Sequence, residues 1–161
     1  MSQTSRVSYW YGARTAIRQG LAQIGIRPGD RVLVPAYACG SEVDTLLKCG
    51  CVLEYYRILQ DMSPDLTHVV DLCRSPARAI FVTHYFGFPQ PMDTIMAMAR
   101  AQGLLVFEDN AHGLFSTDEQ GRPLGSVGDL AVMSFTKALP LPDGGALVVN
   151  RPVEPQEVLV Q

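Results

Sequence analysis

Residues 79–113 read AIFVTHYFGFPQPMDTIMAMARAQGLLVFEDNAHG, and this stretch decides the fold. It begins with the highly apolar segment AIFVTHY at 79–85 and contains a second apolar segment, LLVFED, at 104–109. The residues between them, 90–103, predict a helix that ends at Gly103. A strand, a helix and a second strand of these lengths predict two parallel strands of one sheet. Because the first strand is almost wholly apolar, we expect it to be buried on both faces.

The same alternation of helix and strand continues along the rest of the chain. Further helices are predicted at 12–24, 41–49 and 64–74, and further strands at 31–37, 52–56, 130–135 and 145–150. Ser41 is the expected cap of the second helix, with Asp44 three residues on. This order predicts a three-layer α/β/α fold around a mostly parallel sheet. The 161 residues suffice for one domain with a hydrophobic core.

The composition excludes several classes of partner. The net charge is −3, and no cluster of Lys or Arg suggests nucleic acid or an anionic membrane. No stretch has the apolar length of a membrane span, and the first residues lack the apolar core of a secretory signal. We therefore expect a cytoplasmic protein. The spacings of the four cysteines and three histidines do not predict a metal site.

Polar and reactive side chains follow several of the predicted strands. Ligands of open parallel sheets bind at the carboxyl ends of the strands, so these side chains are the first candidates for a site. They are Tyr37 and Cys39 after the strand at 31–37, His84, Asp109, His112, Ser134 and Lys137. The phosphate turns G-x-G-x-x-G and G-x-x-x-x-G-K-[ST] and the nucleophile elbow G-x-S-x-G are absent from the sequence.

Asp109 and Lys137 each allow two interpretations from the residues alone. Asp109 ends a buried strand, where a carboxylate needs a cationic or donor partner, but it could equally cap the following turn. Lys137 is one of two lysines and follows an apolar strand. An amine in a desolvated pocket there can act as a nucleophile, and the alternative is an ordinary solvated loop lysine.

Four segments together resemble one enzyme family. They are RPGDRVLVPAYAC at 27–39, the stretch from Thr83 to Gly113, GRPLGSVGDLAVMSFTK at 121–137 and DGGALVVN at 143–150. In this order they are similar to the DegT/StrS-type sugar aminotransferases. These are fold-type-I enzymes that use pyridoxal 5'-phosphate (PLP), so the resemblance implies that cofactor and the large-domain fold of those enzymes.

The resemblance implies roles for three residues around the cofactor ring. Asp109 matches the aspartate that pairs with the pyridine nitrogen and keeps it protonated. His112 matches a position, three residues further on, that lies near the phenolic oxygen. Lys137 matches the lysine that holds the cofactor through its amine and later moves a proton at the substrate carbon.

The phosphate group of the cofactor has its own implied partners. Arg14 and Thr15 match a pair whose backbone amides hold the phosphate at a helix N-terminus. Ser134 matches a serine whose hydroxyl binds the same group. The chain departs from the family where SFTK leaves two fewer residues between this serine and the lysine. Cys39 stands where the family has an aromatic residue against the ring, so stacking would have to come from elsewhere, such as Tyr37.

The resemblance implies an aminotransferase that moves an amino group to a keto-sugar, typically one linked to a nucleotide. The family's chains are more than twice as long, so residues 1–161 are expected to be the N-terminal part of the large domain without the small C-terminal domain. The full-length form would be a homodimer. Three alternatives stay open: a catalytically inactive fragment, a PLP-dependent sugar dehydratase, and an unrelated α/β binding domain. Lys137 argues against the dehydratase, because that branch replaces the lysine with histidine.

Overall fold

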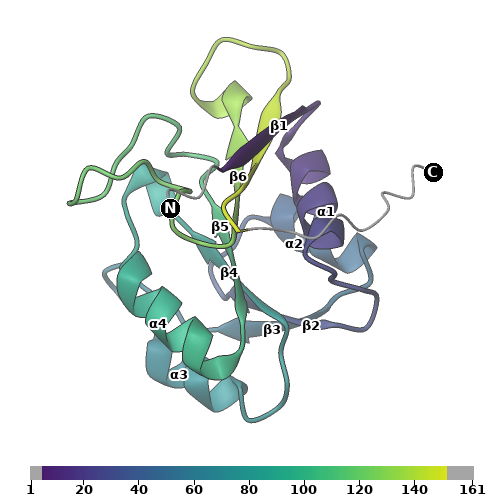
Figure 1. Ribbon diagram of the computed structural model, residues 1–161, viewed down its shortest axis with the longest axis vertical. Coiled ribbons are helices and arrows are strands. Elements are labelled where there is room, and N and C mark those ends of the chain that lie inside the picture. The colour runs from purple at the N-terminus through teal and green to yellow at the C-terminus, as the bar shows by residue number, and fades with distance from the viewer. Residues whose placement is uncertain (1–4, 152–161) are drawn as a thin grey trace.

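A single seven-stranded sheet with helices against both faces forms the core of the molecule, seen here as a computed structural model that describes residues 5–151 (Figure 1). The strands are β1 (Arg6–Trp10), β2 (Arg31–Pro35), β3 (Val52–Tyr56), β4 (Ala79–Thr83), β5 (Leu105–Asp109), β6 (Leu130–Ser134) and β7 (Gly145–Val149). The α-helices are α1 (Ala13–Gln23), α2 (Gly40–Lys48), α3 (Leu66–Leu72) and α4 (Met92–Gln102). Two 3-10 turns, η1 (Tyr85–Gly87) and η2 (Phe135–Lys137), follow β4 and β6.

The strand order is β1-β7-β6-β5-β4-β2-β3. The strands from β6 through β3 pair in parallel, whereas β7 runs antiparallel to both β6 and β1. The expected three-layer fold around a mostly parallel sheet is therefore confirmed. The strand β1 was not predicted, because it lies at the edge of the sheet and leaves most of its side chains exposed.

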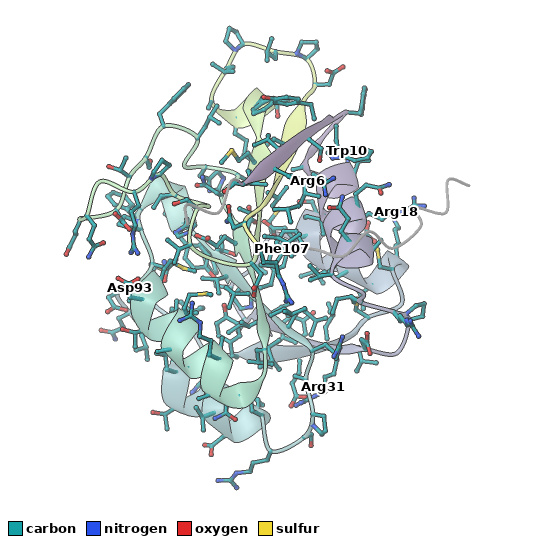
Figure 2. All side chains as sticks on the ribbon, in the orientation of Figure 1. Arg6, Trp10, Arg18, Arg31, Asp93 and Phe107 are labelled. Carbon is teal, nitrogen blue, oxygen red and sulfur yellow. The ribbon has the colours of Figure 1, made fainter. Side chains whose placement is uncertain are left out.

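The two helical layers cover opposite faces of the sheet (Figure 1). On one face, α1 and α2 bury Ile17 and Leu46 against a cluster that includes Phe107, which lies near the centre of Figure 2. On the other face, α3 and α4 bury Val69 and Ile95. Burying side chains of this kind contributes about 1.5–3 kcal/mol each, so packing across the sheet holds the layers together.

The predicted strand–helix–strand unit at 79–109 is present. The strands β4 and β5 pair in parallel from Ala79 opposite Leu105 to Thr83 opposite Asp109. Gly103 ends α4 in the left-handed conformation with φ 69°, as its position predicts. This pairing puts the ends of β4 and β5 side by side at the ligand edge of the sheet.

Some local predictions were wrong. Ser41 does not cap α2, because that helix begins at Gly40 with Cys39 in the capping position and without a capping side-chain hydrogen bond. The strand predicted at 79–85 ends at Thr83, and the next residues turn into η1, where Phe86 has φ 54°. Within residues 5–151, none of the helices has the length and apolar character that crossing a bilayer requires.

Candidate active site

A cavity of about 570 Å³ opens at the carboxyl ends of the central parallel strands. The first turns of α1 and α2, the ends of β5 and β6, the turn η2 and the loop before β7 all contribute to its wall. It is lined by Tyr11, Gly12, Ala13, Arg14, Thr15, Ile17, Ser41, Glu42, Asp109, Ala111, Val132, Ser134, Thr136, Lys137, Pro142, Asp143 and Gly144. Five of the six residues predicted for the site are therefore brought together here, and the sixth, His112, contacts one of them.

Asp109 is the last residue of β5, and its side chain is almost fully buried, with 2% of its surface exposed. One carboxylate oxygen, Oδ1, accepts the backbone N–H of Ala111 at 2.9 Å. The other, Oδ2, is buried and has no hydrogen-bond donor among the described residues. Both interpretations of this residue thus apply to it: one oxygen caps the turn, and the other is left for a partner in the cavity.

Lys137 and His112 form a contact at the mouth of the cavity. The amine Nζ of Lys137 lies 3.1 Å from Nε2 of His112, and both side chains are exposed. The imidazole also stacks on the ring of Phe86, with centroids 6.2 Å apart. Partial burial, and then the positive charge of Lys137, lowers the pKa of His112, while Asp109 acts in the opposite direction. The neutral imidazole can accept a hydrogen bond from the amine of Lys137.

The start of α1 provides unpaired backbone donors. Gly12 precedes the helix in an extended conformation and offers no capping side chain. The first amide that bonds back along the helix is that of Ala16, which donates to the carbonyl of Gly12 at 3.1 Å. The amides of Arg14 and Thr15 precede it, so they have no partner within the helix. Such amides, at the positive end of the helix dipole, suit an anionic group.

Two hydroxyls and a close backbone contact complete this end of the cavity. Ser134 Oγ lies 3.2 Å from Thr136 Oγ1, so a second hydroxyl stands beside the predicted serine. A side chain at Gly145 would meet the amide nitrogen of Ala13 at 2.6 Å. Only glycine allows β7 to approach the start of α1 this closely. Thr136 was not identified as a site residue in the sequence.

Three of the other strand-end candidates do not line the cavity. His84 is fully buried, and its Nε2 lies 2.7 Å from Oε2 of Glu108. It lies at the end of β4 as expected, but its ring forms internal hydrogen bonds and does not line the cavity. Tyr37 is exposed and packs on the ring of Tyr85, with centroids 5.5 Å apart. Cys39 is also exposed. Ring stacking by Tyr37 stays a prediction.

Glu108, the hydrogen-bonding partner of His84, was not identified from the sequence. Its carboxylate accepts the backbone N–H groups of Gly125 at 3.2 Å, of Val127 at 2.9 Å and of Gly128. His84 Nδ1 accepts the amide of Gln90 at 3.2 Å, so the ring proton lies on Nε2 and donates to Glu108. These bonds fix the loops beside the cavity.

Glu42 is the second acid that sequence analysis missed. It lies in the first turn of α2 and lines the cavity with Asp109. Burial, and then the neighbouring Asp109, raises the pKa of Glu42 to about 9. Its oxygen Oε2 is buried without a donor among residues 5–151. A position in the first turn after the strand β2 was the available signal, since that end of the sheet is where ligands bind.

The residues of the cavity fit a phosphate-bearing, nitrogen-containing ring. The bare oxygen of Asp109 is suited to a protonated ring nitrogen, the amine of Lys137 to a carbonyl carbon, and the amides of α1 to a phosphate. The fold and this set of groups define an α/β protein of the type that binds such a cofactor through a lysine. They do not by themselves identify a reaction.

The chain belongs to the DegT/DnrJ/EryC1/StrS aminotransferase family, whose model matches residues 12–160. The family implies pyridoxal phosphate as the cofactor. The chain is 32% identical over 143 residues to GDP-perosamine synthase of Caulobacter vibrioides, and 32% identical over 129 residues to the spore coat polysaccharide biosynthesis protein SpsC of Bacillus subtilis. The matches cover 84% and 78% of this chain but 37% and 33% of those proteins. The chain thus spans little more than a third of their length.

Solved structures agree with the family on the fold. DesV of S. venezuelae, solved in complex with a ketimine intermediate, is 27% identical, with a TM-score of 0.81 over 94% of this chain and 42% of its own. The putative sugar aminotransferase Spr1654 of Streptococcus pneumoniae, in its PMP form, gives a TM-score of 0.83 at 20% identity over the same shares. The fold is therefore that of fold-type-I PLP aminotransferases.

Proposed function

We propose that this chain is the cofactor-binding part of a PLP-dependent aminotransferase that transfers an amino group to a keto-sugar linked to a nucleotide. One observation carries the proposal: the buried, unpartnered oxygen of Asp109 lies in the same cavity as Lys137. The substrate class is supported by the names of relatives, which include GDP-perosamine synthase and a UDP-N-acetyl-3-dehydro-α-D-glucosamine 3-aminotransferase of Acidithiobacillus ferrooxidans, 29% identical over 142 residues.

The ring of the cofactor, when bound, stabilises negative charge on the substrate carbon. Asp109 Oδ2 would accept the N–H of the ring nitrogen and keep its proton in place. Lys137 would hold the cofactor through Nζ and, once released, move a proton at the substrate carbon. His112, 3.1 Å from Nζ, would accept a hydrogen bond from that amine through its neutral imidazole and hold Nζ in place.

The opposite end of the cavity would hold the phosphate. The amides of Arg14 and Thr15 would donate to its oxygens from the start of α1. The hydroxyls of Ser134 and Thr136 are close enough to bind neighbouring oxygens of one group. These contacts would fix the ring between Asp109 and Lys137.

The proposal extends to the setting of the enzyme. We infer a cytoplasmic protein that acts as a homodimer in its full-length form, with a separate small C-terminal domain beyond the large domain to which residues 1–161 belong. The share of the relatives' length that the chain spans supports the last point. A catalytically inactive fragment is the second candidate, and the same share favours it. A dehydratase is disfavoured by the lysine at position 137.

Reduction with borohydride tests the proposal directly. The purified chain is incubated with PLP, reduced, digested and mapped by mass spectrometry. We expect the cofactor on Lys137, no label in Lys137→Ala, and normal labelling in Lys48→Ala, the matched control at the only other lysine. Absence of label, or equal label on both lysines, would falsify the proposal. Label on Lys137 without amino transfer from glutamate would identify the inactive fragment.

A further inference from the structure

Two carboxyl groups line the same cavity. Glu42 comes from the first turn of α2, and Asp109 comes from the end of β5. Each has one buried oxygen that finds no N–H or O–H donor in the part of the chain that the structure describes. Asp109 raises the pKa of Glu42 both through a side-chain hydrogen bond and through its negative charge. Two ionised carboxylates cannot form a hydrogen bond, because both only accept, so a bond between them requires one proton.

The surroundings of Glu42 favour the protonated form of its carboxyl group. Burial disfavours its charged form first, and the neighbouring Asp109 acts in the same direction. Lys137 is the cation that opposes them. The nearby hydroxyl of Tyr85 donates instead to the carbonyl of Tyr37 at 2.6 Å. The pair therefore carries one negative charge, which matches the single positive charge of a protonated ring nitrogen.

We propose that Glu42 is a positioning residue of this site: its neutral carboxyl donates a hydrogen bond to the Asp109 carboxylate and keeps that carboxylate weakly basic. The inference rests on the proposed function, because the basicity of Asp109 matters only if a ring nitrogen faces it. Each carboxylate oxygen accepts up to two hydrogen bonds. Asp109 can thus bind Ala111, Glu42 and a ring N–H together.

The consequence concerns one proton between Asp109 and the ring nitrogen. A donated hydrogen bond stabilises the charged carboxylate and so weakens its pull on that proton. With Glu42 in place, the proton stays on the nitrogen. Without this donor, the more basic Asp109 draws the proton away, and the ring loses part of its capacity to accept electrons.

Infrared spectroscopy of the chain without cofactor tests the pair itself. The difference spectrum between the wild type and Glu42→Gln at neutral pH should contain the C=O stretch of a protonated carboxyl group. The exposed Glu119→Gln is the matched control and should show only the loss of an ionised carboxylate. If the Glu42→Gln difference resembles that of the control, both acids are ionised and the inference is overturned.

The role at the ring is tested with PLP labelled with ¹⁵N at the ring nitrogen. Its NMR shift reports the proton directly, which a merely structural role of Glu42 would not move. We expect the wild-type shift in Glu42→Gln, whose amide still donates to Asp109, and in Glu119→Gln. Glu42→Leu, of similar size and without a donor, should move the shift toward the unprotonated value. An unchanged shift in Glu42→Leu, or equal movement in both variants, overturns the role.

The two experiments also separate this inference from the proposed function. If the wild type binds no PLP, the proposed function and the role at the ring both fail, while the infrared result still decides whether the shared proton exists. If the wild type binds PLP and the variants behave alike, the function stands and the role of Glu42 is overturned.

Discussion

Glu108 and Asp109 are neighbours on β5, both buried, yet their surroundings are opposite. Glu108 receives hydrogen bonds from His84 and from three backbone amides between Gly125 and Gly128. Asp109 receives one, from Ala111, and keeps a bare oxygen in the cavity. Successive side chains of a strand point to opposite faces of the sheet, so adjacent positions reach different environments. Glu108, whose oxygens all have donors, holds the loops in place. Asp109, which keeps one oxygen without a donor, remains able to bind a ligand.

The comparison teaches that burial alone does not identify a site residue. Both acids would be costly to bury without partners, and only one has a full set of them. The bare oxygen of Asp109 is compensated, in our proposal, by a ligand and by the proton of Glu42. Replacing each acid should therefore damage a different property, stability for Glu108 and cofactor binding for Asp109.

Replacement of Glu108 should have the largest effect. Glu108→Ala leaves the ring N–H of His84 and three backbone amides without an acceptor, which should cost about 3–5 kcal/mol of unfolding free energy. Urea unfolding followed by circular dichroism measures this loss. Glu108→Gln keeps one acceptor oxygen, so it should cost less, about 1–3 kcal/mol, and provides a folded variant if the alanine chain does not fold.

An unchanged unfolding free energy in both Glu108 variants would contradict the comparison. Glu54→Gln is a control for loss of a glutamate, since that side chain forms a partly exposed ion pair with Arg31. It should change the unfolding free energy by about 1 kcal/mol or less.

Replacement of Asp109 should have the opposite result: a small change in stability and a large loss of PLP affinity. In Asp109→Asn, Oδ1 can still accept the amide of Ala111, so the unfolding free energy should change by no more than about 1 kcal/mol. The affinity for PLP should fall roughly ten- to a hundredfold, because a hydrogen bond to a charged group contributes about 1.5–3 kcal/mol. Absorbance titration with PLP measures the affinity. A large loss of stability with unchanged PLP affinity would remove the distinction between the two acids.

The pH dependence of stability should reveal Glu42. Burial and the nearby Asp109 raise its pKa from 4.5 to about 9, so the folded chain keeps a proton that the unfolded chain releases. Its contribution to stability is complete below about pH 4.5 and is lost as the pH rises toward about 9. Glu42→Gln should therefore gain stability relative to the wild type across this window.

Urea midpoints at several pH values for the wild type, Glu42→Gln and Glu119→Gln measure this trend. The Glu119→Gln variant should run parallel to the wild type, because that side chain is exposed. A constant difference between Glu42→Gln and the wild type would show that Glu42 titrates alike in the folded and unfolded chains.

Much of the fold could be predicted because its central strands are apolar and its helices have clear ends. The strand at 104–109 and the helix end at Gly103 depend on local composition and backbone sterics, which a sequence displays. The edge strand β1 could not be predicted in this way, since its exposed side chains carry little hydrophobic pattern. Its position depends on pairing with β7, which is distant in the chain.

The residues of the candidate site were likewise predictable only where a local pattern identified them. Asp109 and Lys137 follow apolar strands, so the rule for strand ends identifies them as candidates, and their roles stay predictions. The same rule failed for His84, because it does not specify the face of the sheet to which a side chain points. Glu42 went unnoticed because its significance depends on contact with Asp109, which comes from another strand and is visible only once the chain has folded.

The smallest expected effect concerns the two histidines, which differ in their surroundings as Glu108 and Asp109 do. His84 has both ring nitrogens bonded inside the protein, whereas His112 contacts Lys137 at the cavity mouth. Lys137→Ala removes a positive charge 3.1 Å from His112, so the pKa of His112 should rise, although the effect of partial burial persists. An NMR titration of the imidazole signals measures the shift, with Lys48→Ala as the control that leaves it in place. If the pKa of His112 does not move, the ammonium and imidazole do not interact in solution, and the hydrogen bond proposed between them does not form.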